Sequence, residues 1–422
     1  MADSSKVFSL RGRALKLDTA ADLEKHTADL SSNPDIEEIH IEGNTLGIEA
    51  CQSLAKMLET KQNLRYANLA DIFTGRLLSE IPTALDALLQ ALLKCPKLEK
   101  VNLNDNAFGL NTVEPLRPFL SQHVPLRHLY LNNNGLGPAA GALVAEALTK
   151  LAENKAAARK EGKDVPDLET VICGRNRLET GSMKAWCKAY EANCNVRTVK
   201  MVQNGIWQEG ITMLLKDGLS KCSKLEVLDL QDNTFTVKAA TMFCNVLPSW
   251  PAIVDLGVGD CLFSARGGRR LGATLAEAKN TRLEVLRLQY DEIDAKGVEA
   301  IVNAALSGKA LPRLRRVELN GNKFSEEDPN IEKLQELLSK RKEDSAADYP
   351  HVDEDDEDAW GVDELDELED EDSEEEPAED EMEDEEDSVV KDAEAAESEP
   401  VSQKKDADVD ELANALGKTE LK

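Results

Sequence analysis

The sequence predicts an α/β solenoid of leucine-rich repeats, a horseshoe of the ribonuclease-inhibitor type with a parallel sheet on its concave side and helices on its convex side. Two observations predict it: the pattern LxxLxLxxNxL recurs at intervals of about 28 residues, and an amphipathic helical pattern follows its copies. A third observation separates a tail, because residues 343–422 contain 37 Asp and Glu but only 5 Lys. So acidic a segment cannot bury enough apolar surface to fold. We therefore expect a repeat domain over residues 1–342 and a disordered acidic tail over residues 343–422.

The repeats number about eleven, including a degenerate copy from Val7 to Leu17 that caps the start. The ten regular copies begin at Ile36, Leu64, Leu98, Leu126, Leu168, Val196, Leu225, Ile253, Leu283 and Leu314. In the copy LRHLYL, Leu129 and Leu131 alternate with polar neighbours, which predicts a short strand that buries its leucines and turns His128 and Tyr130 to solvent. Right-handed crossovers then place all strands parallel on one side, and the greater width of the helices curves the array.

An asparagine follows most of the strands, at the position where the chain turns. Its amide can bond the backbone of its own turn and of the next, whose polar groups would otherwise be buried without partners. We expect these residues to form a structural ladder, with Cys261 and Asp291 replacing asparagine in two repeats. The asparagines concerned are Asn106, Asn134, Asn176, Asn204, Asn233 and Asn322.

Two repeats are longer than the others, at 34 and 42 residues. The first carries its extra residues just after the strand, in ADIFTGRLLSEIP, which predicts a longer loop on the rim between strands and helices. The second carries LAENKAAARKEGKDVPD, which predicts a longer helix and return loop. Insertions in repeat proteins often mark the working surface.

Charge and motifs exclude several functions. Residues 1–342 contain 45 Lys and Arg against 44 Asp and Glu and are thus near neutral, so the chain's net charge of −31 comes from the tail. An acidic chain repels phosphate backbones, which argues against nucleic-acid binding. No apolar run reaches the length of a membrane span, and no P-loop, CxxC pair or metal-spaced histidine cluster occurs. We expect a soluble intracellular protein with no metal and no cofactor of its own.

Several stretches contain specific loop residues that the general repeat pattern does not require. They include DIFTGR (Asp71 to Arg76), HLYLNNNGLGPAAG (His128 to Gly141) and ELNGNKFSEED (Glu318 to Asp328). With the acidic tail, they closely resemble the Ran GTPase-activating proteins over nearly the whole chain. The chain is similar to the shorter fungal form, which ends after the tail.

The resemblance implies an activator that binds Ran-GTP and stimulates hydrolysis, supporting nucleocytoplasmic transport. It implies that the activator positions Ran's own catalytic machinery without an arginine finger, and that GTP and Mg²⁺ belong to the GTPase. Arg76 and Asn133 match the family's functional residues: Asn133 would support Ran's glutamine, and Arg76 would serve the interface or the loop. Asn133 lies one residue before the ladder residue Asn134, so the ladder does not explain it.

The residues that follow the strands are a further set of candidate contacts. We assign partner binding to them as a group: Asp105, Asn132, Arg175, Gln203, Asp232, Asp260 and Tyr290. The expected partner is Ran-GTP, alone or with a Ran-binding protein. We expect a monomer that is located in the cytoplasm, either throughout it or enriched at the nuclear envelope. Near the end of the tail, residues 408–417 suit either one short amphipathic helix or a frayed segment.

Two other classes remain open on sequence grounds. A leucine-rich-repeat scaffold whose acidic tail binds basic nuclear proteins also joins the two features, but such proteins have fewer repeats and lack the DIFTGR loop. An inhibitor of the ribonuclease-inhibitor type shares the repeat length, but is rich in cysteine and lacks the tail. An enzyme with its own active site is the least supported class, because no nucleophile, metal or phosphate motif occurs.

Overall fold

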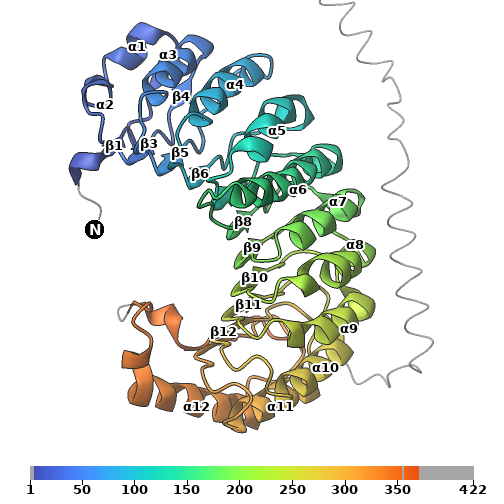
Figure 1. The fold of residues 1–422 in the computed structure, drawn as a ribbon. Helices are drawn as coiled ribbons and strands as arrows, with labels where there is room; N and C mark the ends of the chain where they lie inside the picture. Colours follow the sequence, from blue (N-terminus) through green and yellow to red (C-terminus); the bar gives the residue numbers. More distant parts are fainter. Residues whose placement is uncertain (1–3, 354–355, 370–422) are drawn as a thin grey trace, which may run out of the picture. The chain divides into compact units, whose positions relative to one another are not determined.

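The structure, a computed structural model, describes residues 4–353 and 356–369. The described residues belong to one compact unit, in which twelve short strands line the inner side of a curved array and the helices form its outer layer (Figure 1). All strand pairs are parallel, and neighbours in the sheet follow one another in the chain, apart from one small two-stranded sheet near the start. The predicted leucine-rich-repeat solenoid is therefore confirmed.

Each regular repeat contributes a strand of three residues to the large sheet. Its strands are β1 Val7–Ser9, β3 Glu38–His40, β5 Tyr66–Asn68, β6 Lys100–Asn102, β7 His128–Tyr130, β8 Thr170–Ile172, β9 Thr198–Lys200, β10 Val227–Asp229, β11 Asp255–Gly257, β12 Val285–Arg287, β13 Arg316–Glu318 and β14 Gly361–Val362. The small sheet pairs β2 Lys16–Leu17 with β4 Thr45–Leu46.

The outer layer consists of one helix in most repeats. The helices are α1 Ala20–Glu24, α2 Ala28–Ser32, α3 Ile48–Leu58, α4 Ile81–Leu92, α5 Val113–Gln122, α6 Gly137–Lys160, α7 Glu179–Ala192, α8 Gln208–Met213, α9 Thr236–Val246, α10 Ser264–Ala276, α11 Ala295–Leu306 and α12 Pro329–Ser345. The long helix α6 confirms that the 42-residue repeat extends its helix.

The repeat pattern accounts for the interior. Leu129 and Leu131 are fully buried, while His128 and Tyr130 are half-buried on the concave side, as the alternation predicts. Asn134 shows how the ladder works: its Nδ2 donates to the carbonyls of Leu131 at 2.9 Å and Leu103 at 3.0 Å, and its Oδ1 accepts from the N–H of Asn106 at 3.0 Å. The ladder is confirmed, and it also includes Asn44, which the sequence analysis did not list.

A second column of donors lies at the other end of the helices. In successive repeats a buried side chain donates to a carbonyl of the preceding repeat, as His123 Nε2 meets Leu98 O at 2.7 Å and Asn280 Nδ2 meets Leu247 O at 2.9 Å. In the 42-residue repeat the inserted helix supplies Lys155, whose Nζ lies 2.6 to 2.8 Å from three carbonyl oxygens. Burial lowers the pKa of Lys155 to about 7. Part of the insertion is thus structural.

The folded part continues beyond residue 342, the boundary predicted from composition, so that boundary is wrong. Residues 346–353 and 356–369, which we call the C-terminal cap, pack on the last repeat: Tyr349 and Trp360 meet edge to face at 5.1 Å, and β14 extends the sheet beside β13. The carboxylate of Asp363 accepts from the N–H groups of Leu319 at 2.7 Å and Asn320 at 3.0 Å. A sheet edge leaves backbone groups unpaired, so a few apolar residues within an acidic stretch suffice to cover it. The expected helix at residues 408–417 lies outside the described residues.

Candidate partner-binding site

The turn after each inner strand contains one residue with a left-handed backbone. Its φ lies between 48° and 61° in eight successive repeats, and we call these residues the turn row: Asp71, Asp105, Asn133, Arg175, Gln203, Asp232, Asp260 and Tyr290. The backbone at each is held by the next repeat; the N–H of Asn133, for example, donates to Gly174 O at 2.9 Å. Asn and Asp tolerate this conformation, whereas Arg, Gln and Tyr adopt it at a cost, so their presence suggests a role for the side chain. The structure thus places seven of the nine predicted site residues in one row.

Asn133 and Asn134 are neighbours with opposite orientations. Asn134 is fully buried in the ladder, whereas Asn133 is exposed and its Nδ2 donates to Asp105 Oδ1 at 2.9 Å. The expectation that the ladder does not explain Asn133 is therefore confirmed. The bond to Asp105 orients the amide of Asn133 on the surface of the rim.

The side chain of Asn132, a predicted contact, is bonded within the scaffold. It is half-buried, and its Oδ1 accepts from Gly174 N at 2.6 Å. Its own N–H donates to Asn104 Oδ1 at 2.8 Å. These bonds form a short second ladder across neighbouring turns, so a structural role accounts for Asn132.

Arg76 lies in the inserted loop, with a side chain that is only 9% exposed. Its Nη1 bonds Asp18 Oδ1 at 2.5 Å, its Nε donates to Thr45 Oγ1 at 2.8 Å, and its Nη2 donates to Thr45 O at 2.9 Å. The bond from Arg76 lowers the pKa of Asp18 below its usual range. Asp18 and Thr45 lie in or beside the two-stranded sheet, so Arg76 fastens the inserted loop to the first repeats. Nothing in the repeat pattern points to Asp18 or Thr45.

The C-terminal end of the turn row, from Asp232 to Tyr290, contains closely spaced acidic groups. Burial, and then the neighbouring charge of Asp260, raise the pKa of Asp232, while a hydrogen bond from Gln203 opposes the shift. The Tyr290 hydroxyl donates to Glu367 of the C-terminal cap. Tyr290, expected to contact a partner, is thus already bonded within the chain.

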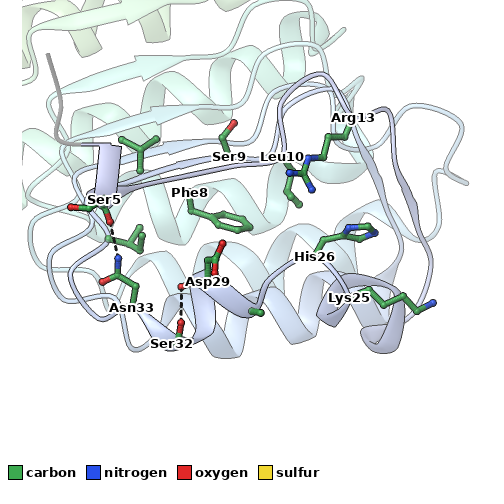
Figure 2. Close-up of a pocket in the computed structure, with 13 residues that line it drawn as sticks. Ser5, Phe8, Ser9, Leu10, Arg13, Lys25, His26, Asp29, Ser32 and Asn33 are labelled. Carbon is green, nitrogen blue, oxygen red and sulfur yellow. Dashed lines mark hydrogen bonds between the residues drawn. The ribbon is translucent and has the colours of Figure 1, made fainter.

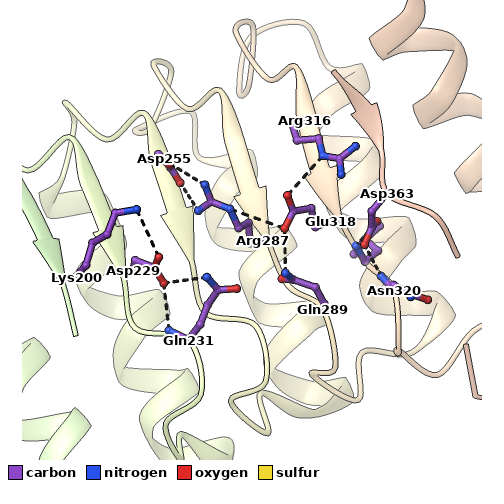
Figure 3. A network of polar contacts seen from close by, with 11 residues as sticks. Lys200, Asp229, Gln231, Asp255, Arg287, Gln289, Arg316, Glu318, Asn320 and Asp363 are labelled. Carbon is purple, nitrogen blue, oxygen red and sulfur yellow. Dashed lines mark hydrogen bonds and ion pairs between the residues drawn. The ribbon is translucent and has the colours of Figure 1, made fainter. Parts of the chain in front are cut away.

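The concave face carries side chains that the sequence analysis did not select. Near the start of the sheet, the Lys100 ammonium lies 4.2 Å from the ring centre of Tyr66 and 5.3 Å from that of Tyr130. Toward the end of the sheet, Arg287 bonds both carboxylate oxygens of Asp255 at 2.6 and 2.8 Å and continues to Glu318 (Figure 3). The strand register could have predicted these contacts. Residues two apart along a strand face the same side of the sheet, so charged residues at equivalent positions of neighbouring strands lie next to each other.

One cavity lies away from the turn row, between β1 and the helices α1 and α2 (Figure 2). It measures about 660 Å³, with the buried side chains of Phe8 and Leu10 in its wall and Arg13, Lys25 and Asp29 around it. Arg13 and Lys25 are basic and Asp29 is acidic, so charges of both signs line it. It is an open groove in the first repeat.

Among residues 4–353 and 356–369, no three His, Cys, Asp or Glu side chains are grouped so that they could hold a metal ion. In the same residues, no helix has both the length and the apolarity to cross a bilayer.

Comparison with known proteins gives consistent relatives. Residues 221–244 match the family described as Leucine Rich repeat. The chain is 39% identical over 339 residues to Ran GTPase-activating protein 1 of Saccharomyces cerevisiae, which covers 79% of this chain and 82% of that protein. It is 34% identical over 364 residues to the Ran GTPase-activating protein of Drosophila melanogaster, covering 85% of this chain and 59% of that one. The match to Ran GTPase-activating protein 1 of Xenopus laevis is 37% over 202 residues, or 47% of this chain and 34% of the relative.

Proposed function

This chain belongs to the family of Ran GTPase-activating proteins, and from that premise we propose that it binds Ran-GTP and accelerates GTP hydrolysis on Ran. The sequence contains no phosphate-binding loop of its own. The nucleotide and its Mg²⁺ therefore belong to the GTPase, and the chain acts on an active site that its partner supplies.

The frame accounts for how such an activator can work without chemistry of its own. Asparagine amides and buried leucines fix each turn relative to its neighbours, so the turn row forms a stiff line of side chains. A rigid line holds a partner residue in one orientation at little further entropic cost. We assign Asn133, oriented by Asp105, to the support of Ran's catalytic glutamine.

The observation that carries the absence of an arginine finger is the environment of Arg76. A finger must reach the transferred phosphoryl group with its guanidinium, whereas that of Arg76 is 9% exposed and engaged with Asp18 and Thr45. Releasing it would break several hydrogen bonds within the chain. Arg76 therefore supports the loop, and activation comes from positioning.

The direct test is single-turnover GTP hydrolysis by purified Ran, without the chain and with the chain at saturating concentration. Activation of GTPases typically spans several decades, so we expect acceleration by roughly 10³-fold or more. An acceleration of about tenfold or less under saturating conditions would contradict the proposal and leave only the scaffold function, since GTPase activation typically spans several decades.

We further propose that the chain acts as a monomer in the cytoplasm, alone or with a Ran-binding protein on the same Ran molecule. Sedimentation of the chain with Ran loaded with a non-hydrolysable GTP analogue tests the stoichiometry. A complex that contains two copies of the chain would contradict it. Imaging of the tagged chain tests the location, and a nuclear signal would contradict that part.

A further inference from the structure

Exposed apolar side chains are concentrated in two consecutive loops of the rim. Six large apolar side chains of the described residues are well exposed, and the three most exposed are Leu77 at 67%, Leu78 at 60% and Leu110 at 54%. The first two lie in the inserted loop after β5, and the third lies in the loop after β6. We call these three leucines the apolar rim patch. Single exposed leucines are ordinary, but a group in adjacent loops is a feature of interaction surfaces.

The exposure of the three leucines does not result from incomplete packing of their loops. In the inserted loop Ile72 and Phe73 are buried, and in the next loop Phe108 is buried, so each loop already has its own apolar anchors. The rings of Phe73 and Phe108 lie 6.5 Å apart, which packs the two loops against each other. The short helix Leu110–Thr112 also packs against α4, the helix that follows Leu77 and Leu78. The two loops that carry the three leucines therefore pack against each other, and other residues fill their buried positions.

The backbone that presents the patch is fixed before any partner binds. The Arg76 side chain ties the loop to Asp18 and Thr45, and within the loop Arg76 N donates to Phe73 O at 3.0 Å and Glu80 N to Leu77 O at 2.9 Å. A preorganised apolar contact loses little conformational entropy on binding. Rigid presentation of this kind is typical of the central contacts of an interface.

The surroundings of the patch indicate the chemistry of its partner. Three carboxylates flank it in the same loops, namely Asp71, Glu80 and Asp105. The nearby basic groups are already paired, Arg76 with Asp18 and Arg117 with Glu114. The patch also adjoins Asp71 and Asp105 of the turn row, the second of which orients Asn133. A surface that fits must present an apolar area bordered by basic side chains.

We propose that the apolar rim patch is the hydrophobic anchor that seats the GTPase against the turn row, with basic side chains of the GTPase meeting the flanking carboxylates. This inference rests on the proposed function and adds the surface by which the partner is held. It separates two tasks: the leucines supply affinity, and Asn133 supplies acceleration of the bound complex.

The test uses the full chain and Ran loaded with a non-hydrolysable GTP analogue. For the double variant Leu77→Asp with Leu78→Asp we expect the Kd to rise at least ~30-fold, since loss of central apolar anchors and the added like charge both weaken binding. Leu110→Asp should raise it by roughly tenfold. At saturating activator, the single-turnover rate should stay within about twofold of that of the parent chain. Leu306→Asp, on the outer layer at the end of α11, is the matched control and should leave both quantities unchanged.

The outcomes separate the two proposals. If the parent chain does not accelerate hydrolysis on Ran, the proposed function fails and the anchor fails with it. If the parent chain accelerates hydrolysis but the folded leucine variants bind Ran as it does, the anchor alone is refuted. If the parent chain self-associates and the leucine variants abolish that association without changing the Kd for Ran, the patch joins two copies of the chain and the inference is likewise refuted.

Discussion

Replacing Arg76 by alanine distinguishes an anchoring residue from an arginine finger. The substitution removes hydrogen bonds from a nearly buried guanidinium to Thr45 Oγ1 at 2.8 Å and Thr45 O at 2.9 Å. Hydrogen bonds from a charged donor each contribute about 1.5 to 3 kcal/mol, and solvent at the mouth of the site reduces that figure. We therefore expect the free energy of unfolding, measured by chemical denaturation, to fall by about 2 to 4 kcal/mol.

The kinetic consequence is the sharper part of this prediction. An anchor works through its partners, so Asp18→Ala should lower the single-turnover rate on Ran in the same direction as Arg76→Ala. The double variant should then be no slower than Arg76→Ala alone, because residues in one network are not additive. Arg76→Lys keeps the charge but lacks the planar fork, so it should resemble Arg76→Ala. Lys163→Ala, a 65% exposed residue of the return loop, is the control.

A finger would behave differently. Its removal costs on the order of 10³ to 10⁵ in rate, and a neighbour that merely holds it aside would not matter. The reasoning is refuted if Arg76→Ala loses that factor at saturating activator while Asp18→Ala retains the parent rate.

Three further predictions follow from the geometry. Asn133→Ala should lower the hydrolysis rate on Ran at saturating activator by at least ~10-fold, with little change in the denaturant midpoint. Asn134→Ala leaves buried ladder carbonyls without a donor, so it should lower the free energy of unfolding by about 2 to 4 kcal/mol. Equal effects of the two variants on stability would contradict the assignment of Asn133 to the partner. Burial lowers the pKa of His123 to about 4. The unfolded chain therefore binds more protons than the folded chain between pH 6.5 and 4. The contribution of His123 to the free energy of unfolding should fall by up to ~3 kcal/mol as the pH drops through that window. His123→Asn, which places here the residue found at Asn193 and Asn280, should flatten that part of the pH profile of urea unfolding, and an unchanged slope would contradict it. Deleting residues 370–422 leaves the C-terminal cap intact and should lower the association rate with Ran at low salt. The association rate of the truncated chain should also depend less on salt concentration. If stopped-flow measurements gave the truncated chain the same salt dependence as the parent, electrostatic steering by the tail would be excluded.

The last of these experiments depends on where the folded part ends. Truncation at residue 342, the boundary that composition suggests, would also remove Trp360 and the strand β14 that covers the last repeat. A loss of activity in that shorter chain would report unfolding of the edge and not a function of the tail. Truncation after Glu369 avoids this confusion.

The repeat architecture follows from the periodicity of the sequence. Each repeat contacts mainly its neighbours, so a fixed spacing in the chain becomes a fixed position in space, and the parallel strands, the buried leucines and the asparagine ladder follow from periodicity. The exposure of Asn133 followed in the same way, because its position beside the ladder residue Asn134 assigns it to the surface.

The construction of the candidate site, in contrast, depends on contacts between distant parts of the chain. Arg76 meets Asp18, 58 residues earlier in the chain, and the acidic segment around Asp363 returns to the backbone of the last repeat. The apolar rim patch joins leucines from two loops that the repeat pattern leaves unspecified. Such contacts depend on insertions and chain ends, where the spacing is broken, so periodicity cannot place them and only the packed fold can.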